Sequence, residues 1–177
     1  MNNTHIEIVQ GDITRRAVDA IVNAANTSLL GGGGVDGAIH RAAGPRLLEE
    51  CKTLGGCATG QAKITAAYQI AQVRFIIHTA GPVYGSAGGR DAALLASCYR
   101  ESLRLAAEHG CRSIAFPSIS TGIYGYPIEE ASRIALNTII SYIAMNPEAL
   151  ERIEMVTFSG RDYEVYQRAF AQLTGSV

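Results

Sequence analysis

The sequence contains no tryptophan, no long run of hydrophobic residues and no long run of charges of one sign. No apolar segment approaches the roughly 18 residues that cross a bilayer, so we expect no membrane span. The N-terminus lacks a basic region followed by an apolar stretch, so it is not predicted to be a signal peptide, and we expect a cytoplasmic protein. The net charge of −1 disfavours a protein that binds nucleic acid mainly by electrostatic attraction.

Cysteine is also scarce, and its spacing argues against paired thiols. The four cysteines are scattered along the chain without a CxxC motif. We interpret them as free thiols, buried as small apolar side chains, in a reducing compartment. The His, Asp and Glu residues show no metal-ligand spacing either, so the sequence predicts no metal site.

Hydrophobic residues make up 47% of the 177 residues, which is enough for a sizeable core, and we expect residues 1–177 to form one domain. Short apolar segments rich in β-branched residues predict strands at 5–9, 19–24, 62–66, 73–79, 113–116 and 152–158. Helical spacing of apolar residues, with proline at starts and glycine after ends, predicts helices at 35–43, 45–52, 92–109, 127–145 and 162–173. The alternation of strands and helices indicates an α/β sandwich.

The most informative segment runs from residue 20 to residue 41. A strand-like run leads through Asn23 and Asn26 to four consecutive glycines at 31–34, and then to Asp36 at the head of a predicted helix. Because glycines are costly to order, this loop is predicted to bring its backbone close to another molecule. Backbone N–H groups that lead into a helix suit an anion such as a phosphate. Asp36 would repel a phosphate, so we expect it to face a different part of the ligand.

A second glycine loop at 116–127 also lies between a predicted strand and a predicted helix. Ligands of open α/β sheets bind beyond the carboxyl ends of the strands, where the N–H groups of residues 120–124 would suit a diphosphate. One such loop would more simply be a turn, but two favour a phosphate site. No lysine follows the glycines as in a Walker A loop, and the dinucleotide fingerprint GxGxxG with its later acid is absent, so we expect no nucleotide cofactor.

Taken together, these motifs resemble those of the macrodomain family, specifically its MacroD-type branch. The matching blocks are GDIT at 11–14, IVNAAN at 21–26, GGVDGAI at 33–39 and STGIYGYP at 120–127, with HTAGP at 78–82 as a fifth. The resemblance implies a three-layer α/β/α sandwich with a mixed central sheet and a cleft for ADP-ribose. Members of this branch deacetylate O-acetyl-ADP-ribose and remove ADP-ribose from acidic side chains of proteins, without a metal. We therefore assign substrate binding to Asp12, Ile13, Gly34, Val35, Ser120, Thr121, Gly122, Ile123, Tyr124 and Phe158.

Three of these side chains have a specific expected role and a simpler alternative. The carboxylate of Asp12 would accept a hydrogen bond from the exocyclic amino group of adenine, and the ring of Phe158 would cover the base. The alternatives are a turn or cap role for Asp12 and an ordinary core position for Phe158. Tyr124 would cover the distal ribose; its alternative is a packed loop aromatic.

Asp36 and Asn26 are the catalytic candidates. A carboxylate within hydrogen-bond reach of a water orients or deprotonates it, and the amide of Asn26 suits paired ribose hydroxyls. The alternative for Asp36 is an acid at a helix N-terminus, favoured by the helix dipole. The dipole would make Asp36 a poor base, so its catalytic role would then be to orient water. The alternative for Asn26 is an Asx-turn. We expect Asn23 to bind the loop's own backbone. His40 could form a dyad with Asp36, but we interpret both His40 and His78 as structural.

Two classes of function remain open. The first is an ADP-ribosyl hydrolase acting on an ester at the distal ribose, and the second is a non-catalytic ADP-ribose-binding reader module. The fold hosts both, so the fold alone does not decide. A reader does not need an acid at Asp36, which favours the hydrolase. The neutral charge and the lack of an aromatic–basic patch make an RNA-binding regulator the weakest interpretation.

Overall fold

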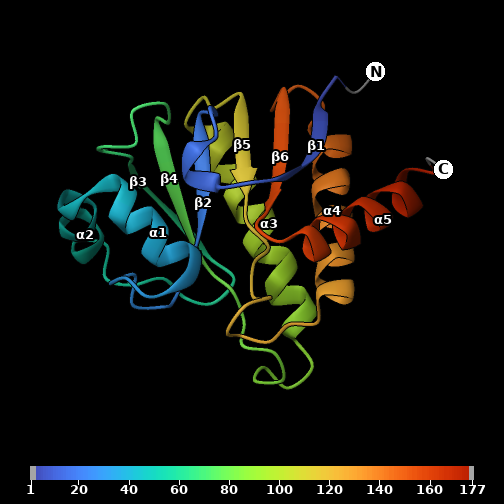
Figure 1. The fold of residues 1–177 in the computed structure, drawn as a ribbon, viewed down its shortest axis with the longest axis horizontal. Helices are drawn as coiled ribbons and strands as arrows, with labels where there is room; N and C mark the ends of the chain where they lie inside the picture. Colours follow the sequence, from blue (N-terminus) through green and yellow to red (C-terminus); the bar gives the residue numbers. More distant parts are fainter. Residues whose placement is uncertain (1–2, 176–177) are drawn as a thin grey trace.

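The computed structural model describes residues 3–175 and contains one six-stranded sheet (Figure 1). The strands follow the order β1-β6-β5-β2-β4-β3. Every neighbouring pair is parallel except β3 and β4, which run antiparallel, so the expected mixed sheet is confirmed. The strands are β1 (His5–Gln10), β2 (Ala20–Ala25), β3 (Ala62–Ala66), β4 (Phe75–Ala80), β5 (Ser113–Phe116) and β6 (Arg152–Thr157).

Helices cover both faces of this sheet, which confirms the three-layer sandwich. One hydrophobic cluster joins the sheet to α1 (Gly34–Ala43) and α2 (Pro45–Lys52). A second cluster on the opposite face joins it to α3 (Asp91–Glu108), α4 (Ile128–Met145) and α5 (Gly160–Thr174). In Figure 1, α1 and α2 lie beside β2 and β4, while α3 passes behind the sheet.

The elements differ from the sequence expectations mainly at their ends. The last helix begins at Gly160 rather than at 162, because Ser159 caps it by accepting a hydrogen bond from the N–H of Asp162. β4 begins at Phe75 rather than at 73, because a turn closed by the N–H of Val73 and the carbonyl of Ile70 precedes it. The sequence did not predict the short 3-10 helix η1 (Ile13–Arg15), which Asp12 caps.

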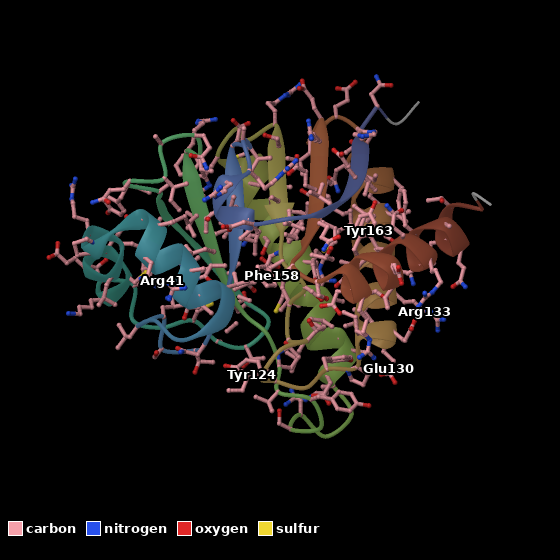
Figure 2. The ribbon with its side chains drawn as sticks, viewed as in Figure 1. Arg41, Tyr124, Glu130, Arg133, Phe158 and Tyr163 are labelled. Carbon is pink, nitrogen blue, oxygen red and sulfur yellow. The ribbon has the colours of Figure 1, made fainter. Side chains whose placement is uncertain are left out.

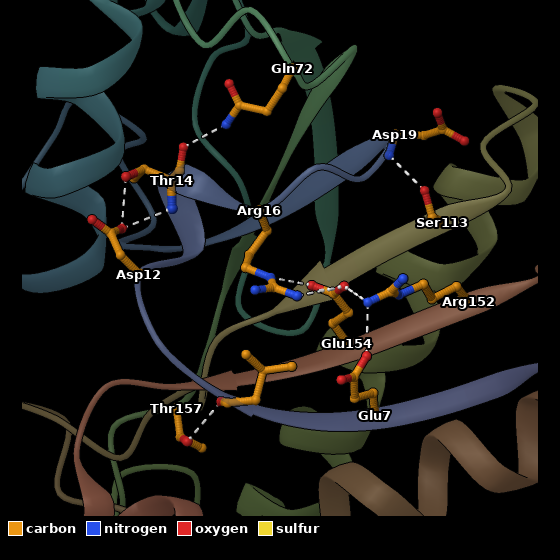
Figure 3. A network of polar contacts seen from close by, with 11 residues as sticks. Glu7, Asp12, Thr14, Arg16, Asp19, Gln72, Ser113, Arg152, Glu154 and Thr157 are labelled. Atoms are coloured by element: carbon orange, nitrogen blue, oxygen red, sulfur yellow. Dashed lines mark hydrogen bonds and ion pairs between the residues drawn. The ribbon is translucent and has the colours of Figure 1, made fainter.

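An ionic network centred on the buried Glu154 holds the segment after η1 onto the sheet (Figure 3). Glu154 on β6 is 1% exposed. Its carboxylate pairs with Arg16 at 2.7 Å and with Arg152 at 2.7 Å, and Arg152 also reaches Glu7 at 2.8 Å. The bond to Glu154 raises the pKa of Arg16. A buried carboxylate is tolerated only when it is paired, so these contacts fix the path of the chain that carries Asp12.

Candidate functional site

A cleft of about 750 Å³ opens where β2, β5 and β6 end and their loops begin. Figure 2 labels three of its lining residues, with Phe158 near the centre of the view, Arg41 to its left and Tyr124 below. Every residue assigned to the site from the sequence lines this cleft: Asp12, Ile13, Asn26, Gly34, Val35, Asp36, Ser120, Thr121, Gly122, Ile123, Tyr124 and Phe158. Segments that are far apart in the chain therefore meet at one edge of the sheet, where open α/β folds bind ligands.

The first glycine loop leads into a helix whose N-terminus has no side-chain cap. α1 starts at Gly34, and the preceding Gly33 offers no capping side chain. Among residues 3–175, no acceptor receives a hydrogen bond from the backbone N–H of Gly34, Val35 or Asp36. These N–H groups carry the positive end of the helix dipole at the cleft, an arrangement that suits an anion.

The second glycine loop presents a longer row of unpaired N–H groups. Ser120 has a φ of 66°, in the left-handed region, and its carbonyl accepts from the N–H of Tyr126 at 2.9 Å. Within the described part of the chain, the backbone N–H groups of residues 120–124 donate to no protein acceptor. The carbonyl of Tyr124 accepts from the N–H of Tyr84, which ties this loop to the neighbouring one. Successive unpaired N–H groups of this kind form an anion-binding concavity.

Asp12 has the cap role that the sequence left as an alternative, and it also lines the cleft. Its Oδ1 accepts from the N–H of Thr14 at 2.9 Å and from the Thr14 hydroxyl at 2.7 Å. Its Oδ2 lies 3.9 Å from Nε of Arg15. Phe158 is 88% exposed, which excludes the alternative core position.

Asp36 is a buried carboxylate, 4% exposed, in the first turn of α1. Its Oδ1 accepts a hydrogen bond from Nδ2 of Asn23 at 2.8 Å. Nε2 of His40 lies 3.3 Å from the same oxygen, without the alignment of a hydrogen bond. The other oxygen, Oδ2, would lie 3.1 Å from a Cβ built on Gly32, a residue of the cleft lining. The protein therefore fixes one oxygen and leaves the other beside the glycine loop.

The expected contact of Asn23 with the loop backbone is wrong. Side chains alternate between the faces of a strand, so Asn23 shares the face of Ile21 and Ala25, which α1 covers. From there its amide reaches Asp36 and His78 instead of the loop. His40 lies within 3.3 Å of Asp36, a contact that fits the structural role expected of it and the possible dyad alike.

Asn26 forms the Asx-turn that was its alternative role. Its Oδ1 accepts from the N–H of Ser28 at 3.0 Å, and its Nδ2 donates to the carbonyl of Gly31 at 2.9 Å. The same Nδ2 would lie 3.6 Å from a Cβ on Gly32, the position that also lies near Oδ2 of Asp36. The amide of Asn26 and the carboxylate of Asp36 therefore converge on one point of the cleft.

Some lining residues were missed by the sequence reasoning. Arg41, one turn after Gly37 on α1, and Asp162, in the first turn of α5, had no motif that pointed to them. Gly81 lies within the HTAGP block, which could have pointed to it. A Cβ on Gly81 would overlap the hydroxyl of Ser120, so the two loops pack closely only because this residue is glycine.

No cysteine lines the cleft among the described residues. All four cysteines are buried free thiols, and burial raises the pKa of Cys51 and of Cys98 to about 11, which keeps these two protonated. Among residues 3–175, no three His, Cys, Asp or Glu side chains gather into a group that could hold a metal ion. No helix in that range is long and apolar enough to cross a membrane.

Residues 22–135 match a family model described as Macro domain. A macro domain-containing protein of Chlorobaculum tepidum is 59% identical over 170 residues, which cover 96% of this chain and 98% of that protein. The human protein named ADP-ribose glycohydrolase MACROD2 is 53% identical over 164 residues, which cover 92% of this chain but 38% of the human protein.

Solved structures agree with these sequence matches. The macrodomain of Oceanobacillus iheyensis with ADP superposes with a TM-score of 0.95 at 48% identity, covering 99% of this chain and 95% of that one. The macrodomain of Trypanosoma brucei in complex with ADP-ribose gives a TM-score of 0.87 at 46% identity, covering 93% of this chain and 68% of that one. The fold, the motifs and the similarity over nearly the whole length agree that this chain belongs to the macro domain family, close to the bacterial macrodomains and to the MACROD2-type ADP-ribose glycohydrolases.

Proposed function

We propose that this chain is an ADP-ribosyl hydrolase that binds ADP-ribose in the cleft and cleaves esters at its distal ribose. Its proposed substrates are O-acetyl-ADP-ribose and proteins that carry mono-ADP-ribose on acidic side chains. The observation that carries the proposal is the buried carboxylate of Asp36, which lies beside two rows of unpaired N–H groups that suit a diphosphate. Related proteins named as ADP-ribose glycohydrolases and related structures with ADP or ADP-ribose support it. The buried free thiols suit a reducing compartment such as the cytoplasm.

In this proposal, the ligand extends along the cleft from Asp12 to Asp36. Oδ2 of Asp12 accepts from the exocyclic amino group of adenine, and the exposed ring of Phe158 covers the base. The N–H groups of residues 34–36 and 120–124 bind the diphosphate. Ile13, Val35 and Ile123 supply apolar walls, and Tyr124 covers the distal ribose.

The proposed reaction is the addition of water to the ester carbonyl carbon. The bond between this carbon and the ribose oxygen then breaks. One proton of the water passes to the ribose oxygen, the other is released to solvent, and the acid leaves as a carboxylate. Asn26 aligns the ribose hydroxyls, and Oδ2 of Asp36 orients the attacking water. A phosphate oxygen of the substrate is available to share the proton transfer, because the diphosphate lies next to the distal ribose.

The test of this function separates binding from turnover. Saturating ADP-ribose is expected to raise the melting temperature, since a ligand that binds only the native state stabilises it by about 2.7 kcal/mol at 100 times its Kd. AMP is expected to raise it less, because it lacks the distal ribose. O-acetyl-ADP-ribose and an aspartate- or glutamate-ADP-ribosylated protein are then incubated with the chain and their rates of cleavage compared. Absence of a thermal shift would refute the ligand, whereas binding without any turnover would favour a reader module.

The adenine contact can be tested without losing the cap of η1. In an Asp12→Asn variant, the side-chain oxygen still accepts from Thr14, so the amide nitrogen takes the place of Oδ2. The amide nitrogen is a donor and cannot accept from the adenine amino group. We therefore expect the Kd for ADP-ribose to rise about tenfold, which corresponds to the loss of roughly one hydrogen bond to a charged group. KM should rise with it and kcat should stay nearly unchanged. Titration calorimetry and steady-state kinetics measure both, with Arg104→Ala, an exposed position on α3 outside the cleft lining, as control. A fall in kcat alone would contradict this placement.

A further inference from the structure

A chain of buried polar side chains runs behind Asp36, away from the cleft. Nδ2 of Asn23 lies 2.8 Å from Oδ1 of Asp36 and 3.1 Å from Nδ1 of His78. Nε2 of His78 in turn lies 2.9 Å from the hydroxyl of Thr65 on β3. Asn23 and His78 are fully buried and Thr65 is 2% exposed, and none of the three lines the cleft. Solvent therefore does not set the direction of these hydrogen bonds.

The chemistry of each group fixes which atom donates along this chain. An ionised Asp36 only accepts, so Asn23 must present its NH2 group to it. The same NH2 group faces Nδ1 of His78, so that nitrogen must be the unprotonated acceptor. The ring proton then lies on Nε2 and points to Thr65, whose hydroxyl donates to the carbonyl of Ala66 at 3.1 Å.

The alternative ring tautomer would reverse the chain. A proton on Nδ1 of His78 would face the NH2 group of Asn23, donor against donor. Rotation of the Asn23 amide would relieve this clash, but it would place the Asn23 oxygen against the carboxylate of Asp36. Within the described residues, Oδ1 of Asn23 has no hydrogen-bond partner, so only its Nδ2 contacts fix the direction of the amide. Burial and the nearby His40 also lower the pKa of His78 to about 3, which keeps its ring neutral.

We propose that Thr65 and His78 are positioning residues, which select one imidazole tautomer and thereby hold the Asn23 amide in the direction that aims the Asp36 carboxylate at the cleft. This inference rests on the proposed hydrolase function, in which Asp36 orients the attacking water. Neither Thr65 nor His78 contacts the ligand site, so both act on the rate of the reaction and not on ligand binding.

The test removes the hydroxyl that receives the ring proton. Thr65→Val keeps the shape of the side chain but deletes the oxygen acceptor, and it leaves Nε2 of His78 only Sγ of Cys51, a weak acceptor 4.0 Å away. Thr65→Ser keeps the hydroxyl. The matched control is Thr79→Val, which deletes another fully buried hydroxyl, bonded to the carbonyl of Gln61 at 2.8 Å, on the neighbouring strand β4. The readouts are kcat and KM for O-acetyl-ADP-ribose, the Kd for ADP-ribose, and the ¹⁵N resonances of the His78 ring, which report its tautomer.

In the wild type we expect a neutral His78 ring with its proton on Nε2. Thr65→Val is expected to lose this preference and to lower kcat about tenfold. A displacement of 1 Å at a reacting centre lowers the rate about 10²-fold, so a smaller shift of the Asp36 carboxylate is expected to lower it less. Its Kd for ADP-ribose should stay within about twofold, because Thr65 is not among the residues that line the cleft. Thr65→Ser should restore both the tautomer and kcat, and Thr79→Val should leave both unchanged.

Three results would overturn the inference: a wild-type ring protonated on Nδ1, an unchanged kcat in Thr65→Val, or an equal fall of kcat in Thr79→Val. Failure of the proposed function would look different. A wild-type chain that binds ADP-ribose but cleaves no ester would refute the hydrolase. Even in that case, a wild-type His78 ring protonated on Nδ1 would still refute the positioning role of Thr65 and His78.

Discussion

An Asp36→Ala variant is expected to lose most ester hydrolysis while it still binds ADP-ribose. Removing a group that orients or deprotonates a reacting water typically lowers the rate by about 10²–10⁴-fold. Binding should largely survive, because the proposed ligand contacts of the two glycine loops and of Asp12 lie elsewhere in the cleft and are unchanged by the substitution. A single-turnover assay with O-acetyl-ADP-ribose measures the loss of rate, and calorimetric titration with ADP-ribose measures the binding.

Two further variants make this test specific. Asp36→Ala removes both the charge and the volume of a buried side chain, whereas Asp36→Asn removes the charge and keeps the volume. Comparing the two variants separates the effect of the lost charge from the effect of the lost packing. Asn26→Ala should show a similar loss of rate with a larger loss of affinity. Because both side chains converge near Gly32, the double variant should be less impaired than the product of the two single variants. Turnover at the wild-type rate in Asp36→Ala would instead indicate hydrolysis assisted by the substrate alone.

A Gly122→Glu variant is expected to abolish ADP-ribose binding. The residue lies in the row of unpaired N–H groups, and its backbone φ is outside the left-handed region. A Cβ at this position would meet no atom within 4 Å, so the folded chain accommodates a side chain there. The glutamate would place bulk and a negative charge where the diphosphate is proposed to bind. Titration calorimetry should detect no binding, while the melting temperature of the free protein should change little.

Substitutions at the same position separate charge from bulk. Gly122→Gln has the bulk of glutamate without its charge and should weaken binding less, and Gly122→Ala should bind nearly as the wild type does. Normal ADP-ribose binding by a folded Gly122→Glu variant would show that this loop is not the phosphate site.

Most of the fold and of the cleft could be predicted from the sequence, because the signals are local. The apolar strands predicted at 62–66 and 113–116 occur at those positions, and glycine patterns marked both loops. The motifs at 11–14, 21–26, 33–39 and 120–127 were expected to line one cleft because of their resemblance to the macrodomain family, and all four contribute residues to its lining.

What the sequence did not predict depends on contacts between distant segments. The side chain of Asn23 contacts His78, which is 55 positions away, and no local pattern encodes that pairing. The spacing of Asp36 and His40 suggested that the two could meet, and only the folded structure gives the distance of 3.3 Å between them. Asp162 lines the cleft because α5 packs against β6 and β1 of the sheet. The matching family motifs all end before this helix, so none pointed to it.

If the unpaired N–H groups of the two glycine loops bind the diphosphate as proposed, the charges around them bear on which anions the cleft accepts. The charged side chains that line it are three carboxylates, Asp12, Asp36 and Asp162, and one guanidinium, Arg41. The lining side chains therefore repel anions at long range, while the backbone dipoles attract them only at short range. We expect a ligand with two phosphate groups that fits the loops to overcome this repulsion, whereas a triphosphate or a nucleic acid strand would bring more negative charge without additional donors. The carboxylates of the cleft are therefore expected to weaken the binding of larger polyanions relative to ADP-ribose.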